Sequence, residues 1–489
     1  MNTEIRRLFL VFSLLFAALV AIGSYWLWRA PSLEARQGNP TQLIREVTTK
    51  RGLIYAADGK TILARNRGRE VSGRRWFLRR YPTKELTSHV VGYATLERAR
   101  TGLEESMNDF LTGGNSNLAT VLERARARFG GDVREGNDLV LTIDAPAQEK
   151  ALEALAGTCG SIVALEPESG RVLVMASTPS YDPNLAARRF DEVLAQTGPC
   201  TPASPLLNRA TQGLYPPGST FKVVTAAAAL DTGLHTPGST FFDRGFCIEY
   251  GQRVFNYSDQ NGPEMFGRVT LSESLEHSIN AVFCDIGQEL GTDTVLDYAR
   301  RFGFYERPPL ETPEGERLAS GLYQRNKLFE PRLESDVDVG RLAFGQERLL
   351  ATPLQMAVVA ATVANGGERM RPFVVDRILK PDESVLTETE PKSLGRATTE
   401  RTAAELAEMM ERVVRTGTGR AAQIPGVRVA GKTGTAETGE DELNDAWFIG
   451  FAPAENPKIA IAVAISDQEG TGGALAAPKA KEVMEVLLR

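Results

Sequence analysis

An uncharged, almost wholly apolar segment runs from Leu8 to Trp28 near the start of the chain. Its length matches the roughly 20 residues that an α-helix needs to cross a bilayer. Tyr25 and Trp26 lie near its far end, where aromatic rings favour the membrane interface. We therefore expect a single transmembrane anchor over residues 8–28, and the rest of the chain must fold beside the membrane.

A cleavable signal peptide is the alternative interpretation of this segment. Its apolar region would be shorter, and the small residues of Ala21-Ile22-Gly23 would offer the cleavage site. Arg6 and Arg7 favour a cytoplasmic N-terminus, whereas Arg29 and Arg36 weaken that asymmetry. The expected topology places residues 1–7 in the cytoplasm and the chain after the anchor outside the cell membrane.

Length and composition indicate ordinary globular domains behind the anchor. A chain of 489 residues is too long for one hydrophobic core and suggests two or three domains. The net charge of −6 gives no sign of a nucleic-acid partner. There are only three histidines and no CxxC pair, which argues against a Cys/His zinc site. Once exported, four cysteines could pair in three ways or stay reduced and buried: Cys159, Cys200, Cys247 and Cys284.

Ser219 lies at the predicted start of a helix. Pro216–Gly218 disfavours helix before it, whereas Phe221–Leu230 is a strong helical run. Lys222 follows three residues later, so the two side chains share one face. The helix N-terminus favours developing negative charge, and a lysine among apolar neighbours loses its proton more easily. The pair suits catalysis through a covalent serine ester, although an ordinary capping serine is the simpler explanation of Ser219 taken alone.

A second polar motif, Ser278-Ile279-Asn280, separates two helical runs. A tight bend there would turn both polar side chains the same way. Ser278 could then pass a proton between Lys222 and a leaving group, and Asn280 could orient a substrate amide. A helix cap is again the alternative.

A third motif, Lys432-Thr433-Gly434-Thr435, lies on or just after a weakly alternating strand. Lys432 offers positive charge for a carboxylate, and Gly434 lets a substrate backbone approach closely. Strict alternation puts Lys432 on the opposite face from both threonines, so all three can serve one site only at an edge strand. Gly426–Thr433 also matches the phosphate-loop pattern, but glycines and acidic residues follow it where a helix should begin, so we expect no nucleotide site.

The order and spacing of these motifs resemble those of the penicillin-binding proteins, the acyl-serine D,D-transpeptidases. Further segments are similar to the same family: residues 51–54, 58–59, 63–64, 180–184, 345–346, 352–356, 364–367, 435–437 and 446–448. The region before the catalytic part is too short for a glycosyltransferase domain, which indicates a monofunctional class B protein. Four more segments resemble the small class B subgroup called penicillin-binding protein A: residues 81–82, 89–93, 102–104 and 472–478.

The resemblance implies an α+β fold with two parts behind the anchor. A transpeptidase domain over residues 157–489 would combine an antiparallel sheet flanked by helices with a helical subdomain. A small mixed pedestal domain over residues 29–156 would precede it. Residues 41–135 are rich in arginine, for which a solvated basic face is the simplest explanation. The family analogy adds a partner, a membrane glycosyltransferase of the SEDS type docked on the pedestal.

The resemblance also assigns roles in bacterial wall synthesis and division. Ser219 would attack the penultimate D-alanine carbonyl of a donor stem peptide, Lys222 would take its proton, and Ser278 would relay a proton to the leaving D-alanine. Backbone N–H groups of Ser219 and Thr435 would form the oxyanion hole. Lys432 and the two threonines would hold the terminal carboxylate. An amine of a second stem peptide would accept the acyl group, and a β-lactam would remain as a stable ester. No metal or organic cofactor is needed.

Three alternatives use the same residues differently. A serine β-lactamase would need a base for deacylating water, and Glu437 does not suit that role. A β-lactam sensor would need a transducing region, whereas only seven residues precede the anchor. A non-catalytic scaffold would not need intact motifs.

Overall fold

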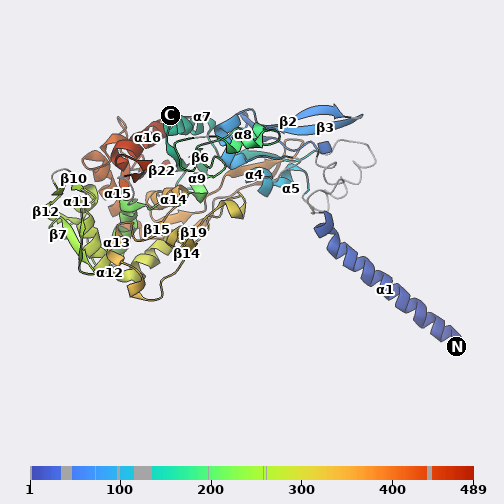
Figure 1. Ribbon diagram of the computed structural model, residues 1–489, viewed down its shortest axis with the longest axis horizontal. Coiled ribbons are helices and arrows are strands. Elements are labelled where there is room, and N and C mark those ends of the chain that lie inside the picture. Colours follow the sequence, from blue (N-terminus) through green and yellow to red (C-terminus); the bar gives the residue numbers. More distant parts are fainter. Residues whose placement is uncertain are drawn as a thin grey trace.

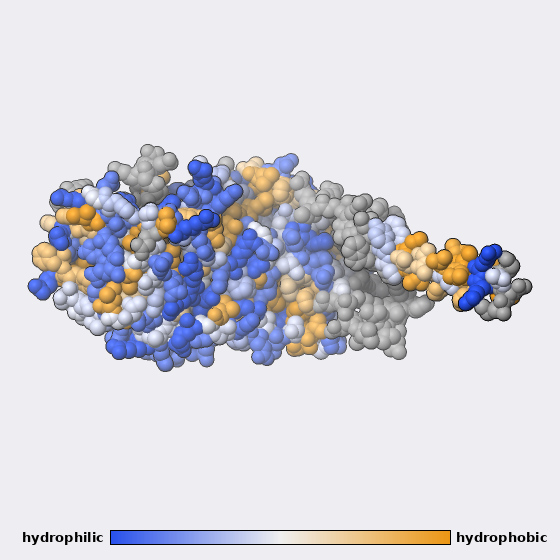
Figure 2. Space-filling view, turned by 90° about the horizontal axis from the view of Figure 1, so that it is seen from below, coloured by the Kyte–Doolittle hydropathy of each residue, from blue (hydrophilic) through white to orange (hydrophobic). Residues whose placement is uncertain are grey.

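The computed structural model describes residues 3–34, 47–71, 73–95, 100–114, 135–196, 198–256, 258–259, 262–437 and 443–489. Helix α1 (Thr3–Glu34) projects away from the body of the molecule (Figure 1). Its stretch Ile5–Trp26 has a mean hydropathy of 2.4 and is not buried against any other part of the structure. Figure 2 shows this apolar surface beside a body whose surface is largely hydrophilic. The helix therefore has the length and composition of the single membrane span predicted for residues 8–28.

A six-stranded sheet with the order β18-β17-β4-β1-β2-β3 forms one part of the body. Four strands come from the N-terminal region: β1 (Ile54–Tyr55), β2 (Ile62–Val71), β3 (Arg74–Arg80) and β4 (Asp138–Leu141). Short helices accompany them: η1 (Lys84–Thr87), α3 (Ser88–Val91), α4 (Gly102–Ser106) and α5 (Asn108–Leu111). Two strands come from much later in the chain, β17 (Val375–Leu379) and β18 (Val385–Glu388), and β17 pairs with β4. The sheet therefore joins the two halves of the sequence.

Seven of the fifteen arginines in residues 41–135, the region to which the sequence analysis assigned a basic face, lie on the β2–β3 hairpin. Arg65, Arg67 and Arg69 are exposed along β2. Arg79 differs, because its guanidinium donates to the fully buried Glu104, as does that of Arg51 at 2.7 Å. Burial alone would raise the pKa of Glu104, but these two cations hold it below its ordinary value. This buried group anchors the hairpin base to α4.

The second large sheet is antiparallel and five-stranded, in the order β20-β21-β22-β5-β6. Its strands are β5 (Cys159–Leu165), β6 (Val172–Thr178), β20 (Ala430–Glu437), β21 (Asn444–Ala452) and β22 (Ile459–Gln468). Successive residues of β22 point into two different hydrophobic cores on the two faces of the sheet. Ile461 and Val463 belong to the core that contains α7 (Ala145–Leu155) and α16 (Gly472–Leu487). Ala460 and Ala462 belong to the core that contains α14 (Pro353–Ala364). β5 and β6 form an antiparallel hairpin, and β20 is an edge strand.

Helices occupy the other end of the body, opposite α1 (Figure 1). The main helices here are α10 (Lys222–Asp231), α11 (Leu271–Glu276), α12 (Asn280–Arg301), α13 (Val339–Ala343) and α15 (Glu400–Arg415). Paired strands flank them: β7 (Thr240–Asp243) with β12 (Gly267–Thr270), and β8 (Phe246–Glu249) with β9 (Gln252–Phe255). Further short strands are β13 (Gly321–Gln324), β14 (Lys327–Leu328), β15 (Leu349–Leu350), β16 (Glu368–Met370) and β19 (Ser393–Arg396).

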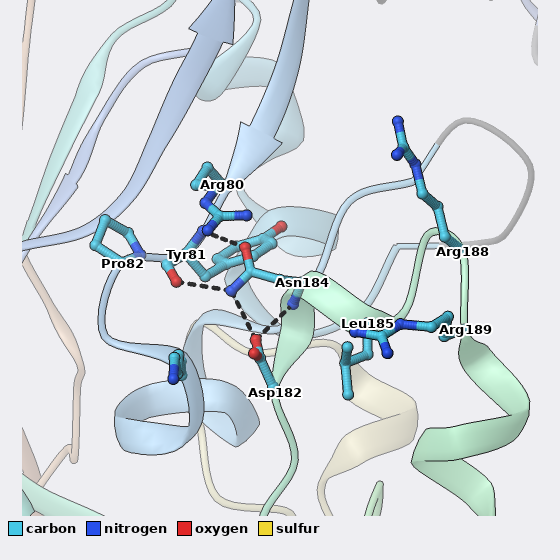
Figure 3. Close-up of a pocket in the computed structure, with 9 residues that line it drawn as sticks. Arg80, Tyr81, Pro82, Asp182, Asn184, Leu185, Arg188 and Arg189 are labelled. Carbon is cyan, nitrogen blue, oxygen red and sulfur yellow. Dashed lines mark hydrogen bonds between the residues drawn. The ribbon is translucent and has the colours of Figure 1, made fainter.

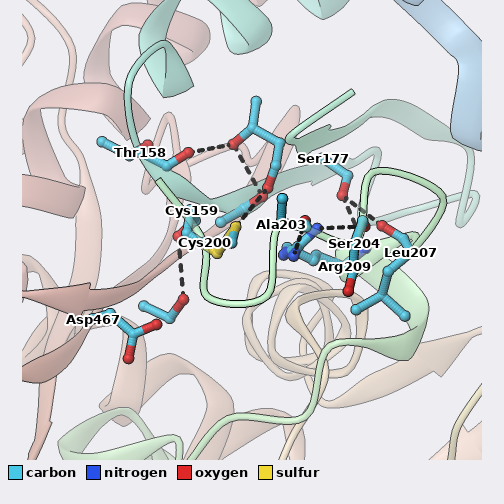
Figure 4. Close-up of a disulfide and its surroundings, with 12 residues drawn as sticks. Thr158, Cys159, Ser177, Cys200, Ala203, Ser204, Leu207, Arg209 and Asp467 are labelled. Atoms are coloured by element: carbon cyan, nitrogen blue, oxygen red, sulfur yellow. Dashed lines mark hydrogen bonds between the residues drawn. A yellow bond between two sulfur atoms is a disulfide. The ribbon is translucent and has the colours of Figure 1, made fainter. Parts of the chain in front are cut away.

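The four cysteines form two disulfides, Cys159–Cys200 and Cys247–Cys284. The first joins the start of β5 to the loop that leads to Arg209 (Figure 4). The second joins β8 to α12. The sequence left three pairings and a reduced state open, and the fold selects one of the pairings.

The segment Ser180–Asn184 fastens the N-terminal region to the rest of the body. The amide of Asn184 pairs with the backbone of Tyr81, accepting from Tyr81 N at 3.0 Å and donating to Tyr81 O at 2.8 Å (Figure 3). Asp182 holds that amide in place at 2.6 Å, and Tyr181 donates to Ser88 O at 3.1 Å. The contact lines a cavity of about 360 Å³.

Candidate active site

Ser219 is the second residue of a short turn, η3 (Gly218–Phe221), which leads directly into α10. The turn is held from two sides: Gly218 N donates to Gly345 O at 3.0 Å, and the buried Trp447 donates its indole N–H to Pro216 O at 2.9 Å. Gly218 has a φ of +51°, a conformation that glycine adopts without strain. The half-buried serine therefore lies at a helix start, as the sequence predicted, on a fixed backbone.

Lys222 begins α10, and its side chain is fully buried. Its ammonium nitrogen Nζ lies 2.6 Å from Ser278 O, 2.7 Å from Asn280 Oδ1 and 3.4 Å from Ser278 Oγ. No hydrogen bond joins Lys222 Nζ to Ser219 Oγ in the described part of the chain. Catalytic hydrogen bonds of this kind often tighten only when substrate is bound. Asn280 therefore holds the lysine here, a contact that the sequence analysis did not anticipate.

Ser278 lies between the two lysines. Its backbone has a φ of +62°, an uncommon conformation for a residue with a side chain, at the tight bend between α11 and α12. Lys432 Nζ donates to Ser278 Oγ at 2.8 Å and to Thr433 O at 2.8 Å. The structure thus brings all three sequence motifs together around one hydroxyl.

Burial makes both lysines weak bases. Burial, and then the charge of Lys432, lower the pKa of Lys222 well below its ordinary value. Burial also lowers the pKa of Lys432 to about 7. Lys222 therefore loses its proton more readily than an exposed lysine, and Lys432 is partly charged near neutral pH.

Alternation along β20 puts Lys432 on the opposite face from Thr433 and Thr435. The three residues can still serve one site because β20 is an edge strand. Lys432 reaches Ser278, while Thr433 Oγ1 lies 2.6 Å from Thr418 Oγ1, and Thr435 Oγ1 accepts from Gly472 N at 3.2 Å. Because no strand covers the outer edge of β20 in the described part of the chain, the backbone of this motif can face the serine turn.

Two glycines let the strand and the turn touch. A Cβ on Gly434 would lie 2.8 Å from Pro217 O and 2.9 Å from Thr220 Cγ2, and one on Gly218 would lie 3.0 Å from Thr435 O. The structure therefore shows that a side chain at position 434 would clash with the serine turn of the protein itself. The sequence analysis had attributed the need for glycine there to the approach of a substrate backbone. The Thr435 carbonyl faces the turn, and the N–H of the same strand residue projects to the same side.

Sequence reasoning missed Thr418, which follows α15 and contacts Thr433. Its only signal was the run Thr416-Gly417-Thr418-Gly419, which breaks a helical pattern just before the third motif. A Cβ on Gly417 would lie 2.4 Å from Glu276 O, so this turn packs against the helix that precedes Ser278.

The sequence matches the family described as the penicillin binding protein transpeptidase domain over residues 160–485. It also matches the penicillin binding protein A dimerisation domain over residues 51–139. It is 36% identical over 513 residues to the peptidoglycan D,D-transpeptidase PbpA of Mycolicibacterium smegmatis, a match that covers 100% of this chain and 99% of the relative. Identity to the PbpA of Mycobacterium tuberculosis is also 36%, over 520 residues, with the same coverage.

Solved structures give the same result. The fold is similar to penicillin-binding protein A from M. tuberculosis in its ceftriaxone acyl-enzyme complex, with a TM-score of 0.80 and 34% identity over 91% of this chain and 100% of the other. The imipenem acyl-enzyme complex of the same protein gives a TM-score of 0.79 over the same shares. A D,D-transpeptidase domain from Eggerthella lenta gives 0.76 at 32% identity, covering 90% of this chain and 98% of that one.

Proposed function

Because the chain belongs to the penicillin-binding transpeptidase family, we propose that it is a peptidoglycan D,D-transpeptidase that cross-links stem peptides through an acyl-enzyme on Ser219. The observation that carries this proposal is the meeting of Lys222, Ser278 and Lys432 beside a serine at a helix start. The similarity to proteins solved as β-lactam acyl-enzymes supports the same chemistry.

In the first half-reaction, Ser219 Oγ attacks the penultimate D-alanine carbonyl of a donor stem peptide. Lys222 takes the serine proton, because burial favours the neutral form of this lysine. Ser278 Oγ, within 3.4 Å of Lys222 Nζ, passes a proton to the amine of the departing D-alanine. The peptide bond breaks as the ester forms.

The backbone N–H groups of Ser219 and Thr435 stabilise the oxyanion, a contribution of roughly 3–4 kcal/mol per donor. Lys432, Thr433 and Thr435 hold the terminal carboxylate, and Gly434 keeps the strand close to the serine turn. In the second half-reaction, an amine of a second stem peptide attacks the ester and releases Ser219. A β-lactam acylates the same serine and stays attached as a stable ester.

Intact mass measured after incubation with a penicillin, followed by peptide mapping, tests this proposal. We expect one adduct per chain, on the peptide that contains Ser219, and no adduct in Ser219→Ala. Ser384→Ala, in the β17–β18 turn, is the matched control and should acylate normally. An adduct on another residue, or wall cross-linking unchanged by Ser219→Ala in cells, would contradict the assignment.

The topology and the partner are further parts of the proposal. Residues 1–7 lie in the cytoplasm, α1 spans the membrane and the body lies outside it, where an oxidising compartment suits two disulfides. Protease added to intact spheroplasts should digest the body, and complete protection would contradict this orientation.

Residues 29–156 act as a pedestal for residues 157–489, and the pedestal docks a SEDS-type membrane glycosyltransferase. Co-purification with and without residues 41–135 tests the docking, and equal recovery would count against it.

A further inference from the structure

A shallow hollow of about 130 Å³ opens between β7, β8 and α12. Apolar side chains and polar side chains share its lining: Phe242, Phe246 and Ile248 with Arg244, Asp285 and Gln288. The hollow lies at the end of the body opposite α1, where Figure 2 shows apolar surface among hydrophilic residues. It lies outside the serine site, and the proposed mechanism uses none of these six residues.

The apolar wall of the hollow faces solvent. Phe242 is 70% exposed and Ile248 is 55% exposed, so neither side chain contributes much to a core. The ring of Phe246 is braced instead: Arg253 lies 4.4 Å from its centroid, and Phe255 meets it edge-on at 6.0 Å. Exposed aromatic side chains that the fold holds in place are typical of binding surfaces.

The polar groups of the hollow are available to a ligand. In the described part of the chain, the carboxylate of Asp285 accepts no hydrogen bond, and the charge of Arg244 acts on it without a contact short enough for an ion pair. Gln288 donates to Ile248 O at 2.8 Å, which leaves its carbonyl oxygen free to accept. A small number of polar groups around an apolar wall is the usual composition of a small-molecule site.

The hollow is fixed relative to the serine site. The disulfide Cys247–Cys284 ties β8 to α12, and Asn280 donates to Phe255 O at 3.3 Å. Asp285 follows Asn280 by five residues on the same helix, about 7.5 Å along its axis. A stem peptide of about five residues spans at most about 17 Å, which is longer than this axial separation.

We propose that this hollow binds a saccharide unit of the glycan strand whose stem peptide reacts at Ser219. The inference rests on the proposed transpeptidase function, because that reaction presents a peptide attached to a sugar chain. The apolar face of a sugar ring packs on Phe242 and Phe246. Its hydroxyl and acetamido groups hydrogen-bond to Asp285, Gln288 and Arg244.

Binding of two probes to the full-length chain in detergent, carrying Ser219→Ala to prevent turnover, tests the proposal. One probe is a disaccharide bearing the stem peptide, and the other is the same peptide without sugar. We expect the sugar-bearing probe to bind roughly tenfold more tightly. Phe242→Ala and Asp285→Asn should each remove most of that difference and leave binding of the free peptide unchanged.

Matched controls come from exposed residues outside the hollow. Val385→Ala on β18 and Asp293→Asn further along α12 should keep the tenfold difference. Equal binding of the two probes, or a difference that survives Phe242→Ala, would overturn the proposal. Penicillin acylation of the chain with Ser219 intact is measured in parallel. Its absence would refute the proposed function, whereas the sugar-dependent difference is read independently of any reaction.

Discussion

At the scale of single residues, one hydroxyl lies between two buried amines. Ser278 Oγ is 3.4 Å from Lys222 Nζ and 2.8 Å from Lys432 Nζ. Two protonated ammonium groups so close together repel each other, and burial penalises both charges. The arrangement therefore favours one neutral lysine, which suits the proposed base, and one charged lysine, which suits the proposed binding of a carboxylate.

The two depressed pKa values predict a bell-shaped pH profile for acylation by a penicillin. The rate should rise with pH while Lys222, whose pKa lies well below its ordinary value, loses its proton. It should fall above about pH 7, because Lys432, with a pKa of about 7, loses the charge that holds the carboxylate. Second-order acylation rates between pH 5 and pH 9 measure this. A rate that keeps rising up to pH 9 would contradict the role of Lys432.

Thr418 gives a second prediction at this scale. Its hydroxyl lies 2.6 Å from that of Thr433, so it sets the orientation of a group proposed to bind the carboxylate. Thr418→Val keeps the shape and removes the hydroxyl. We expect the second-order acylation rate to fall about tenfold, which corresponds to roughly 1.4 kcal/mol. Thr418→Ser should restore the rate. Equal rates in the Val and Ser variants would show that only packing matters there.

At the scale of elements, the site depends on close contact between the edge strand β20 and the turn η3. A Cβ at position 434 would meet Pro217 O, a backbone atom that cannot rotate away. Gly434→Ala should therefore push strand and turn apart, costing about 1–3 kcal/mol of stability and at least about 100-fold in acylation rate. Stopped-flow acylation and thermal denaturation measure the two effects.

Gly315→Ala is the matched control, because a Cβ there meets open space and its backbone has no positive φ. It should change neither quantity. Wild-type acylation in Gly434→Ala would mean that the contact between β20 and η3 does not matter for the reaction.

Local sequence patterns predicted individual helices and strands, but they did not predict contacts between segments that are far apart in the sequence. The prolines and glycine of residues 216–218, followed by a helical run, predicted the start of α10. The pairing Cys247–Cys284 and the contact of Thr418 with Thr433 depend on how separate elements pack. A period-two pattern also cannot say which neighbour a strand will pair with, so nothing in residues 375–388 announced that β17 would join β4.

At the scale of the whole molecule, this shared sheet makes the two parts of the body depend on each other. β17 pairs with β4 from Val375↔Leu141 to Leu379↔Asp138, and Gly102 N donates to Glu316 at 3.0 Å. One hydrophobic cluster contains Ile54 and Leu139 together with the core of the later domain. Dividing the chain at residue 157 would therefore break the contacts that join the two parts of the body.

A fragment of residues 157–489 should consequently be less stable than one of residues 47–489. Removing β4 exposes the edge of β17, and removing Tyr81 leaves the Asn184 amide without its backbone partners. We expect a melting temperature lower by at least about 5 °C and a greater tendency to aggregate. The fraction that remains folded should still acylate, because the residues around Ser219 all lie within it. Calorimetry of the two fragments, with penicillin labelling of each, measures both effects. Identical melting temperatures would show that the shared sheet adds no stability to the catalytic part.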